Sequence, residues 1–239
     1  CMKRGQVSIF IIVSVVLIAV IGISIILSKS NLLGISFSGI PQEITPIYEA
    51  MQICVEQRAI DAINIIGLQG GYISPPEDSL KTEFSTIAFG LKNGKNILPA
   101  QEKIENEIEN YLVSVLPFCF SIDDFPEFEI VMHEINAKAA IKDNQIDIML
   151  RAPLSIGKGE KITQLKNPYT TIVEVPLGKM HTRADKIIKK RITDPDYIDL
   201  TFLSEGEFKT LFIPVDERII IYSITDASQF NENSYNFMF

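Results

Sequence analysis

The sequence predicts an α+β protein with an N-terminal transmembrane helix and an extracellular domain of two to three helices and an antiparallel sheet. One observation behind this prediction is an uncharged apolar run at residues 9–27. The other is a change of hydrophobic period after Pro117, from the 3.6-residue spacing of helices to the alternation of strands. We expect four parts: a signal-like start at 1–8, the helix at 9–27, a linker at 28–41 and the α+β domain at 42–239.

The apolar run is long enough to cross a bilayer as a helix, which takes about 20 residues. The alternative is a cleaved secretory signal, whose apolar core is usually ~7–15 residues long and precedes a site of small residues that is missing here. Lys3 and Arg4 precede the run and Lys29 follows it, which favours a cytoplasmic N-terminus. The sequence therefore predicts a single-pass protein of the cell membrane, with the lipid bilayer as a partner.

Composition excludes several classes of function. The net charge of −8 argues against a nucleic-acid partner, which would require a basic face. Three Cys and two His among 239 residues exclude a zinc-cluster protein and a disulfide-dense scaffold. His133 and His181 lack a metal-binding spacing, and residues 155–160 lack the spacing of a phosphate loop. We expect no enzyme, no metal and no cofactor.

The segment KRGQVS at residues 3–8, directly before the apolar run, resembles the archaeal class III signal peptide of type IV pilin-like proteins. In that family a peptidase cuts between Gly and Gln, and the apolar helix then packs in the core of a filament. The resemblance implies a processing site between Gly5 and Gln6 and self-association through the N-terminal helix. The family usually has Glu at the fifth position after the cut, where this chain has Phe10.

Most of the chain is also similar to single-pass surface proteins of small-genome archaea. The residues that carry this resemblance are KRGQVS, the segment IGLQGGYI at 66–73, Cys54, Cys119 and the segment IYSI at 221–224.

Three segments of the domain predict helices. Thr45 and Pro46 suit a helix start, apolar residues then follow at helical spacing, and Gly67 suits its end. Pro99 opens a second helix that reaches about residue 116, and residues 179–192 predict a third with a basic end.

Strands are expected between and after these helices, in a single antiparallel sheet. The expected strands are 85–91, 128–134, 137–141, 146–152, 162–165, 170–177, 201–203, 208–215 and 218–225. Residues 230–239 predict a further edge strand, paired either within the chain or with a neighbouring copy.

Cys54 lies on the inner face of the first expected helix, and Cys119 comes just after the second. An exterior, oxidising location would allow them to form a disulfide. The alternative is two buried thiols that behave as small apolar side chains.

The most unusual segment holds Gly67, Gln69, Gly70, Gly71 and Tyr72. Three glycines beside an aromatic ring are compatible with a binding loop. They are equally compatible with a tight, packed connection between helix and sheet, which we favour because glycines chiefly permit special backbone conformations.

The first functional hypothesis is a membrane-anchored archaeal cell-surface structural protein, as a self-assembling pilin-like filament or surface-appendage subunit. The alternative is a monomeric, membrane-anchored binding module, an adhesin or a solute receptor. The alternative predicts an apolar pocket near the glycine segment. A third hypothesis, an exterior hydrolase, finds no set of residues for the usual catalytic roles.

Overall fold

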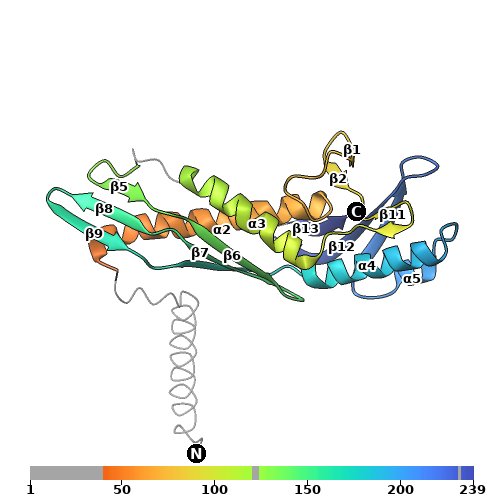
Figure 1. Cartoon of the computed structure of the whole chain (residues 1–239). Coiled ribbons are helices and arrows are strands. Elements are labelled where there is room, and N and C mark those ends of the chain that lie inside the picture. Colours follow the sequence, from red (N-terminus) through yellow and green to blue (C-terminus); the bar gives the residue numbers. More distant parts are fainter. Residues whose placement is uncertain (1–39, 120–123, 231–232) are drawn as a thin grey trace, which may run out of the picture. The chain divides into compact units, whose positions relative to one another are not determined.

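The structure, a computed structural model, describes residues 40–119, 124–230 and 233–239 (Figure 1). The described part contains few helices. They are η1 (Gln42–Ile44), α2 (Thr45–Leu68), α3 (Gln101–Val115), η2 (Leu116–Phe118), α4 (Leu177–Thr193) and α5 (Leu200–Ser204).

Thirteen strands in the described residues form five antiparallel sheets. Two are small hairpins, β1 (Ser79–Lys81) with β2 (Thr86–Ala88), and β3 (Leu91–Lys92) with β4 (Lys95–Asn96). The other three have three strands each, in the orders β5-β8-β9, β10-β7-β6 and β11-β12-β13. Their bounds are β5 (Glu129–Met132), β6 (Asn136–Ile141), β7 (Ile146–Arg151), β8 (Leu154–Lys158), β9 (Lys161–Leu165), β10 (Tyr169–Val173), β11 (Lys209–Pro214), β12 (Ile220–Phe230) and β13 (Asn233–Met238).

The predicted α+β class with a single antiparallel sheet is wrong, because the thirteen strands of the described chain are divided among five antiparallel sheets. One break between sheets follows β7, where Ala152 and Pro153 precede β8. Proline has no backbone N–H with which to continue a strand ladder. After this break, β8 pairs with β5 and β9 rather than extending the sheet of β6, β7 and β10.

The predicted single-pass membrane location is also corrected. Among the residues that the structure describes, no helix is both long enough and apolar enough to cross a membrane. The segment 9–27, on which that prediction depended, lies outside the described residues, as do the signal-like start at 1–8 and most of the linker at 28–41.

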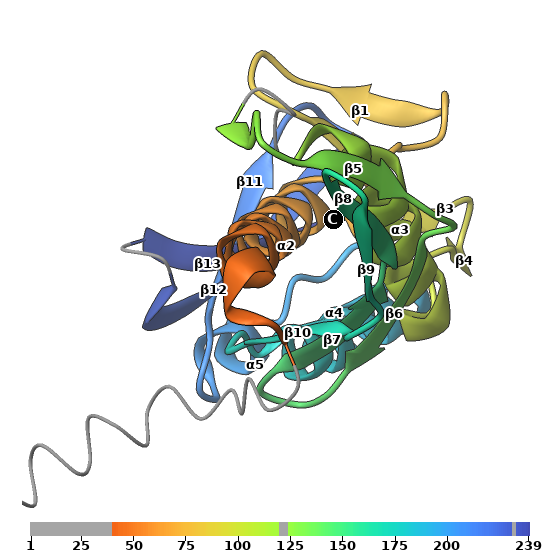
Figure 2. The ribbon, with the colours of Figure 1, turned by 90° about the vertical axis from the view of Figure 1, so that its left-hand side faces the viewer.

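Helix α2 forms the centre of the core. Its residues Ile47, Met51 and Ile63 are fully buried, and the helix contacts α3, β10 and β13. The view along the helix in Figure 2 shows the β11-β12-β13 sheet on one side of α2 and α3 on the other. Because α2 is covered on several sides, its apolar residues are not confined to the single stripe of a surface helix.

Gly67 allows α2 to approach β13 at backbone distance. A Cβ atom at Gly67 would lie 2.3 Å from the carbonyl oxygen of Asn236 and 2.9 Å from the ring of Tyr235. At this contact the Tyr235 hydroxyl donates a hydrogen bond to the Ile63 carbonyl oxygen, at 3.2 Å. Because Gly67 has no side chain, the helix and the C-terminal sheet can pack at this short distance.

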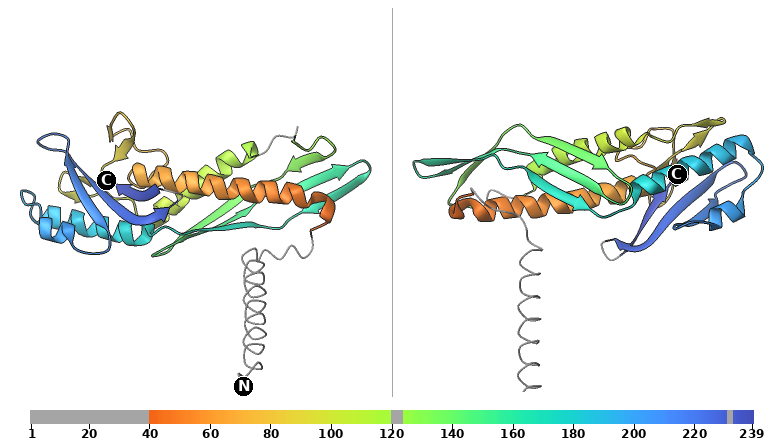
Figure 3. Two further views of the ribbon diagram at one scale, coloured as in Figure 1. Left: turned by 180° about the vertical axis from the view of Figure 1, so that it is seen from behind. Right: turned by 90° about the horizontal axis from the view of Figure 1, so that it is seen from below.

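The C-terminal sheet has an inner face that packs against α4 (Figure 3). Tyr222, Ile224 and Phe237 are buried there. The Phe237 ring lies edge-on to His181 of α4, with ring centroids 6.4 Å apart. Strand β13 pairs with β12, so the expected edge strand at 230–239 is confirmed, within its own chain.

Residues 201–203 form part of α5, and the strand expected there is wrong. The Asp199 carboxylate accepts a hydrogen bond from the Phe202 backbone N–H, at 2.9 Å. This is the arrangement of a helix N-cap, which favours a helical turn over an extended chain.

Candidate functional site

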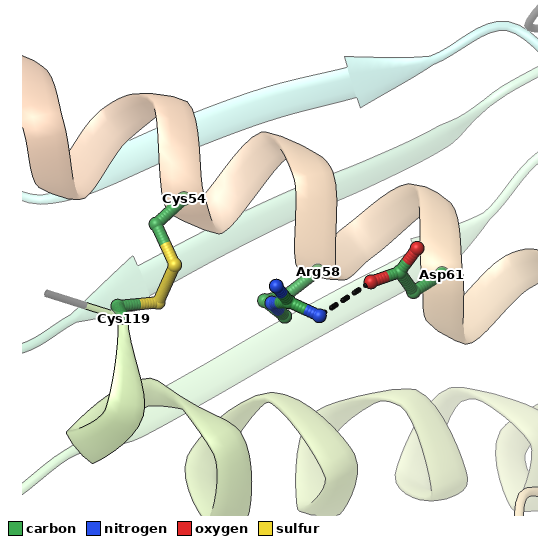
Figure 4. The surroundings of a disulfide bond; sticks show 4 residues. All are labelled: Cys54, Arg58, Asp61 and Cys119. Carbon is green, nitrogen blue, oxygen red and sulfur yellow. Dashed lines mark hydrogen bonds and ion pairs between the residues drawn. A yellow bond between two sulfur atoms is a disulfide. The ribbon is translucent and has the colours of Figure 1, made fainter.

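The expected pairing of Cys54 and Cys119 is confirmed (Figure 4). The disulfide joins the middle of α2 to the residue that follows η2, and the two Cα atoms are 5.6 Å apart. Nearby on α2, the exposed Arg58 and Asp61 form an ion pair at 2.7 Å. The disulfide therefore crosslinks the two central helices at one end of their contact.

The glycine segment follows the end of α2 and is closely packed. Gly70 and Gly71 have φ angles of +69° and +91°, which side chains rarely adopt. A Cβ atom at Gly70 would lie 2.8 Å from the Ala88 carbonyl oxygen, and one at Gly71 would lie 2.7 Å from Pro99 Cγ. These contacts favour a packed connection over a binding loop. Gln69 and Tyr72 are half-buried beside the glycines, and the segment lines none of the cavities described below.

A carboxylate from α3 holds the chain just after this segment. Glu107 Oε2 accepts hydrogen bonds from the backbone N–H groups of Ile73, at 3.1 Å, and Ser74, at 3.3 Å. Its other oxygen pairs with Lys103 Nζ at 2.9 Å, and its side chain is 13% exposed. Burial alone would raise the pKa of Glu107, but the ion pair and the two backbone donors lower it below its ordinary value.

We expect Glu107→Gln to destabilise the protein at pH 7 by about 1–2 kcal/mol, because the charged acceptor of two backbone donors is lost. A lowered carboxyl pKa contributes stability above the unfolded pKa, and this contribution is lost as the pH falls through the folded pKa. The difference in free energy of unfolding between wild type and variant, measured by urea denaturation, should therefore become smaller at acidic pH. Glu102→Gln, at an exposed position on the same helix, should change stability little at either pH.

The histidines lie apart and have separate partners. His133 Nε2 lies 2.6 Å from Ser155 Oγ, and His181 Nε2 lies 2.7 Å from the Pro99 carbonyl oxygen. Within residues 40–119, 124–230 and 233–239, no three Cys, His, Asp or Glu side chains gather as metal ligands would. The segment 155–160 belongs to the β8–β9 hairpin, with Gly159 in its turn.

The outer face of the C-terminal sheet exposes an apolar row that we call the β11 surface, formed by Leu211, Ile213 and Val215. These side chains are 43%, 46% and 48% exposed. On the inner face of the same strand, Phe212 is also 36% exposed. Single exposed apolar residues are common on proteins, but a row of them on one strand indicates an interaction surface.

On the edge of β11 that faces away from β12, the backbone groups have no hydrogen-bond partner among the described residues. The Val215 N–H donates to the Ile219 carbonyl oxygen at 2.9 Å, so in an antiparallel ladder the odd-numbered residues of β11 point toward β12. The N–H and C=O groups of Thr210 and Phe212 then point away from β12, toward the open edge. Pro214 offers only its carbonyl on this edge, which shortens the stretch that another strand could pair with.

The β11 surface was not singled out by the sequence reasoning, which predicted only a strand at 208–215. The signal was present in the run LFIPV, where apolar residues occupy both faces of the strand. A half-buried strand would alternate apolar and polar residues.

The basic end of α4 turns back onto its own chain. Lys190 Nζ pairs with the Asp199 carboxylate at 2.8 Å, and Lys189 pairs with Asp185 at 2.6 Å. Arg191 Nη1 donates to the Tyr197 carbonyl oxygen at 3.0 Å. The contacts of Lys190 and Arg191 order the loop between α4 and α5 and close one side of a cavity that we describe below.

The expected processing site, Gly5 and Gln6, lies outside the described residues and stays a prediction. Comparison of the chain with protein-family models, curated proteins and solved structures finds no match, so the candidate sites are interpreted from their own geometry.

Proposed function

We propose that this protein is a non-enzymatic structural subunit that associates with other copies of itself through strand β11. The observation that carries the proposal is the β11 surface beside an open sheet edge. The row of Leu211, Ile213 and Val215 offers apolar area, and Thr210 and Phe212 offer backbone donors and acceptors. Association of identical edges is a common source of continuous sheets between protein copies.

The strand fits a symmetric pairing with its own copy. With Phe212 of one copy opposite Phe212 of the other, two antiparallel β11 strands would form about four backbone hydrogen bonds. Thr210 would donate to the carbonyl of Pro214, which needs no N–H on that edge. Leu211 would lie opposite Ile213 on the outer face, and such apolar cross-strand pairs contribute about 0.2–1 kcal/mol each.

The resemblance of residues 3–8 to a pilin-like start supports the same class of function and implies a second contact, through the N-terminal apolar segment. Contacts through β11 pair two copies, whereas a second contact elsewhere on the chain would extend pairs into a longer assembly. The two contacts use separate residues, so substitutions in β11 test the sheet contact by itself.

We expect Ile213→Lys and Thr210→Pro each to convert associated protein to monomers. The lysine places a charge in the apolar row, where it would lie opposite Leu211 of the other copy. The proline removes an N–H that points to the open edge, so it should leave the pairing with β12 intact. The measurement is sedimentation velocity of the full chain over a concentration series, in a mild detergent that keeps the N-terminal apolar segment dispersed.

Ile172→Lys is the matched control, because Ile172 is a 61% exposed apolar residue on β10, in another sheet. It should leave the sedimentation profile unchanged. A wild-type chain that stays monomeric at all concentrations would overturn the proposal, and so would an equal effect of the control and the β11 variants.

A further inference from the structure

A cavity of about 360 Å³ lies between the end of α4, the following loop, α5 and strand β12. Its apolar walls include Ile187, Ile198, Phe202 and Leu203. Small organic ligands usually bind in cavities of roughly 300–1,000 Å³ with mostly apolar walls and a few polar groups. The size and the lining therefore suit a small organic molecule.

Tyr222 lines this cavity and carries an unused polar group. Its hydroxyl is buried and has no hydrogen-bond partner among the described residues. The residue is only 6% exposed, and its ring stacks on Phe239 with centroids 5.5 Å apart. Buried hydroxyls nearly always have a partner, so an unpartnered one beside a cavity indicates a place for an acceptor.

Arg191 lines the same cavity and brings positive charge. The neighbouring Lys189 and Lys190 are paired with carboxylates, whereas Arg191 has only a backbone carbonyl as its partner among the described residues. Burial raises the pKa of Tyr222 and the Arg191 charge opposes this, with a raised pKa as the result. The hydroxyl is therefore protonated at neutral pH and can donate toward the same acceptor as Arg191.

Phe202 is fixed as a wall of the cavity. The guanidinium carbon of Arg183 lies 4.0 Å from its ring centroid, and Lys190 Nζ lies 4.5 Å from it. Asp199 caps the start of α5 and also pairs with Lys190, which ties α5 to the end of α4. A wall held by such contacts is formed before a ligand arrives, which lowers the cost of binding.

We infer that this cavity binds a small amphipathic organic anion. The anionic head, a carboxylate or sulfonate, would accept hydrogen bonds from the Tyr222 hydroxyl and from Arg191. The apolar body would lie against Ile187, Phe202 and Leu203. This inference is independent of the proposed self-association, because the cavity and the β11 surface have no residue in common.

The test uses two probes with the same aromatic body. The anion is 8-anilinonaphthalene-1-sulfonate, and the neutral analogue is N-phenyl-1-naphthylamine. Their binding is followed by fluorescence titration of the full chain carrying Ile213→Lys, so that the β11 surface offers less apolar area to the probes. We expect Tyr222→Phe and Arg191→Gln each to weaken binding of the anion about tenfold, the usual effect of losing a hydrogen bond to a charged group. The affinity for the neutral probe should change less than about twofold.

Arg218→Gln is the control, because Arg218 lines a neighbouring cavity that shares Ile187, Arg191 and Tyr222 with this one. It should leave the affinity for the anion unchanged. The inference is overturned if Tyr222→Phe leaves the affinity for the anion unchanged, or if the variants weaken the binding of both probes equally. If Arg218→Gln lowers the affinity for the anion as much as Arg191→Gln does, the inference is also overturned, because the anion would then bind in the neighbouring cavity.

Discussion

Removal of the Cys54–Cys119 disulfide should lower the free energy of unfolding by about 4 kcal/mol. The two cysteines are separated by 65 residues in sequence. Opening a loop of that length restores conformational entropy to the unfolded chain, and the chain-entropy relation gives about 4 kcal/mol at 25 °C. This is a large part of the 5–15 kcal/mol that stabilises a typical domain.

The measurement compares urea unfolding of the wild type and the double variant Cys54→Ser/Cys119→Ser, each with and without reductant. The wild type should weaken on reduction to about the level of the variant, and the variant should not respond to reductant. Equal stability of oxidised wild type and variant would contradict the prediction. A fall in the urea midpoint without a change in slope would place the effect on stability rather than on the compactness of either state.

The second large effect is expected from Gly67→Ala, with a loss of about 2–3 kcal/mol. In a helix interior alanine is normally favoured over glycine by about 1 kcal/mol. Here the added methyl group would lie 2.3 Å from the Asn236 carbonyl oxygen, so α2 and β13 must move apart. Forcing atoms into a packed core costs about 1–3 kcal/mol, and the movement would also weaken the bond from Tyr235 to Ile63.

Gly94→Ala provides the matched comparison. Gly94 has a φ of +70° but no atom within 4 Å of an added Cβ, so its substitution should cost about 1 kcal/mol, from backbone strain alone. Chemical denaturation compares the stability of the wild type, Gly67→Ala and Gly94→Ala. Amide hydrogen exchange should show faster opening of β13 in Gly67→Ala only. A Gly67→Ala protein as stable as the wild type would show that helix preference outweighs the close contact.

Helices were the most predictable part of the fold, because local sequence determines them. The expected starts and ends lie within about two residues of α2, α3 and α4. The N-cap position differs by one residue from the expected one. Helix α2 begins at Thr45 itself, so the N-cap is Ile44, whose side chain makes no hydrogen bond to the helix. A tight turn also has a local signal, as in the Asn93–Gly94 turn between β3 and β4, where both residues have positive φ.

The grouping of strands into sheets could not be predicted, because it depends on partners far apart in the chain. Strand β5 is separated from its partner β8 by the β6–β7 hairpin, and β10 returns to pair with β7. Periodicity shows that a segment is extended but not which segment lies beside it. The same limit applies to the cavity, where Tyr222 and Arg191 come from different elements and meet only in the folded chain.

The disulfide was inferred from the expected exterior, oxidising location of the two cysteines, and the structure bears out the pairing. The glycine segment was correctly recognised as unusual. Its role follows from contacts with Ala88 and Pro99, which no local pattern reveals. The β11 surface had a local signal, because its apolar residues do not alternate with polar ones. Its exposure could not be predicted, because it depends on which face of the C-terminal sheet packs against α4.

The contact between α2 and β13 has a consequence for synthesis of the chain. Tyr235 bonds to Ile63, 172 residues earlier. At roughly 5–20 residues per second, ribosomes need on the order of 10–30 s to add the residues between them. For that time the side of α2 that will contact β13 has no partner. Cys119 emerges much sooner after Cys54, so the crosslink between the two central helices can form while the last strands are still being made. The order of synthesis thus favours an early helical pair that the C-terminal sheet completes.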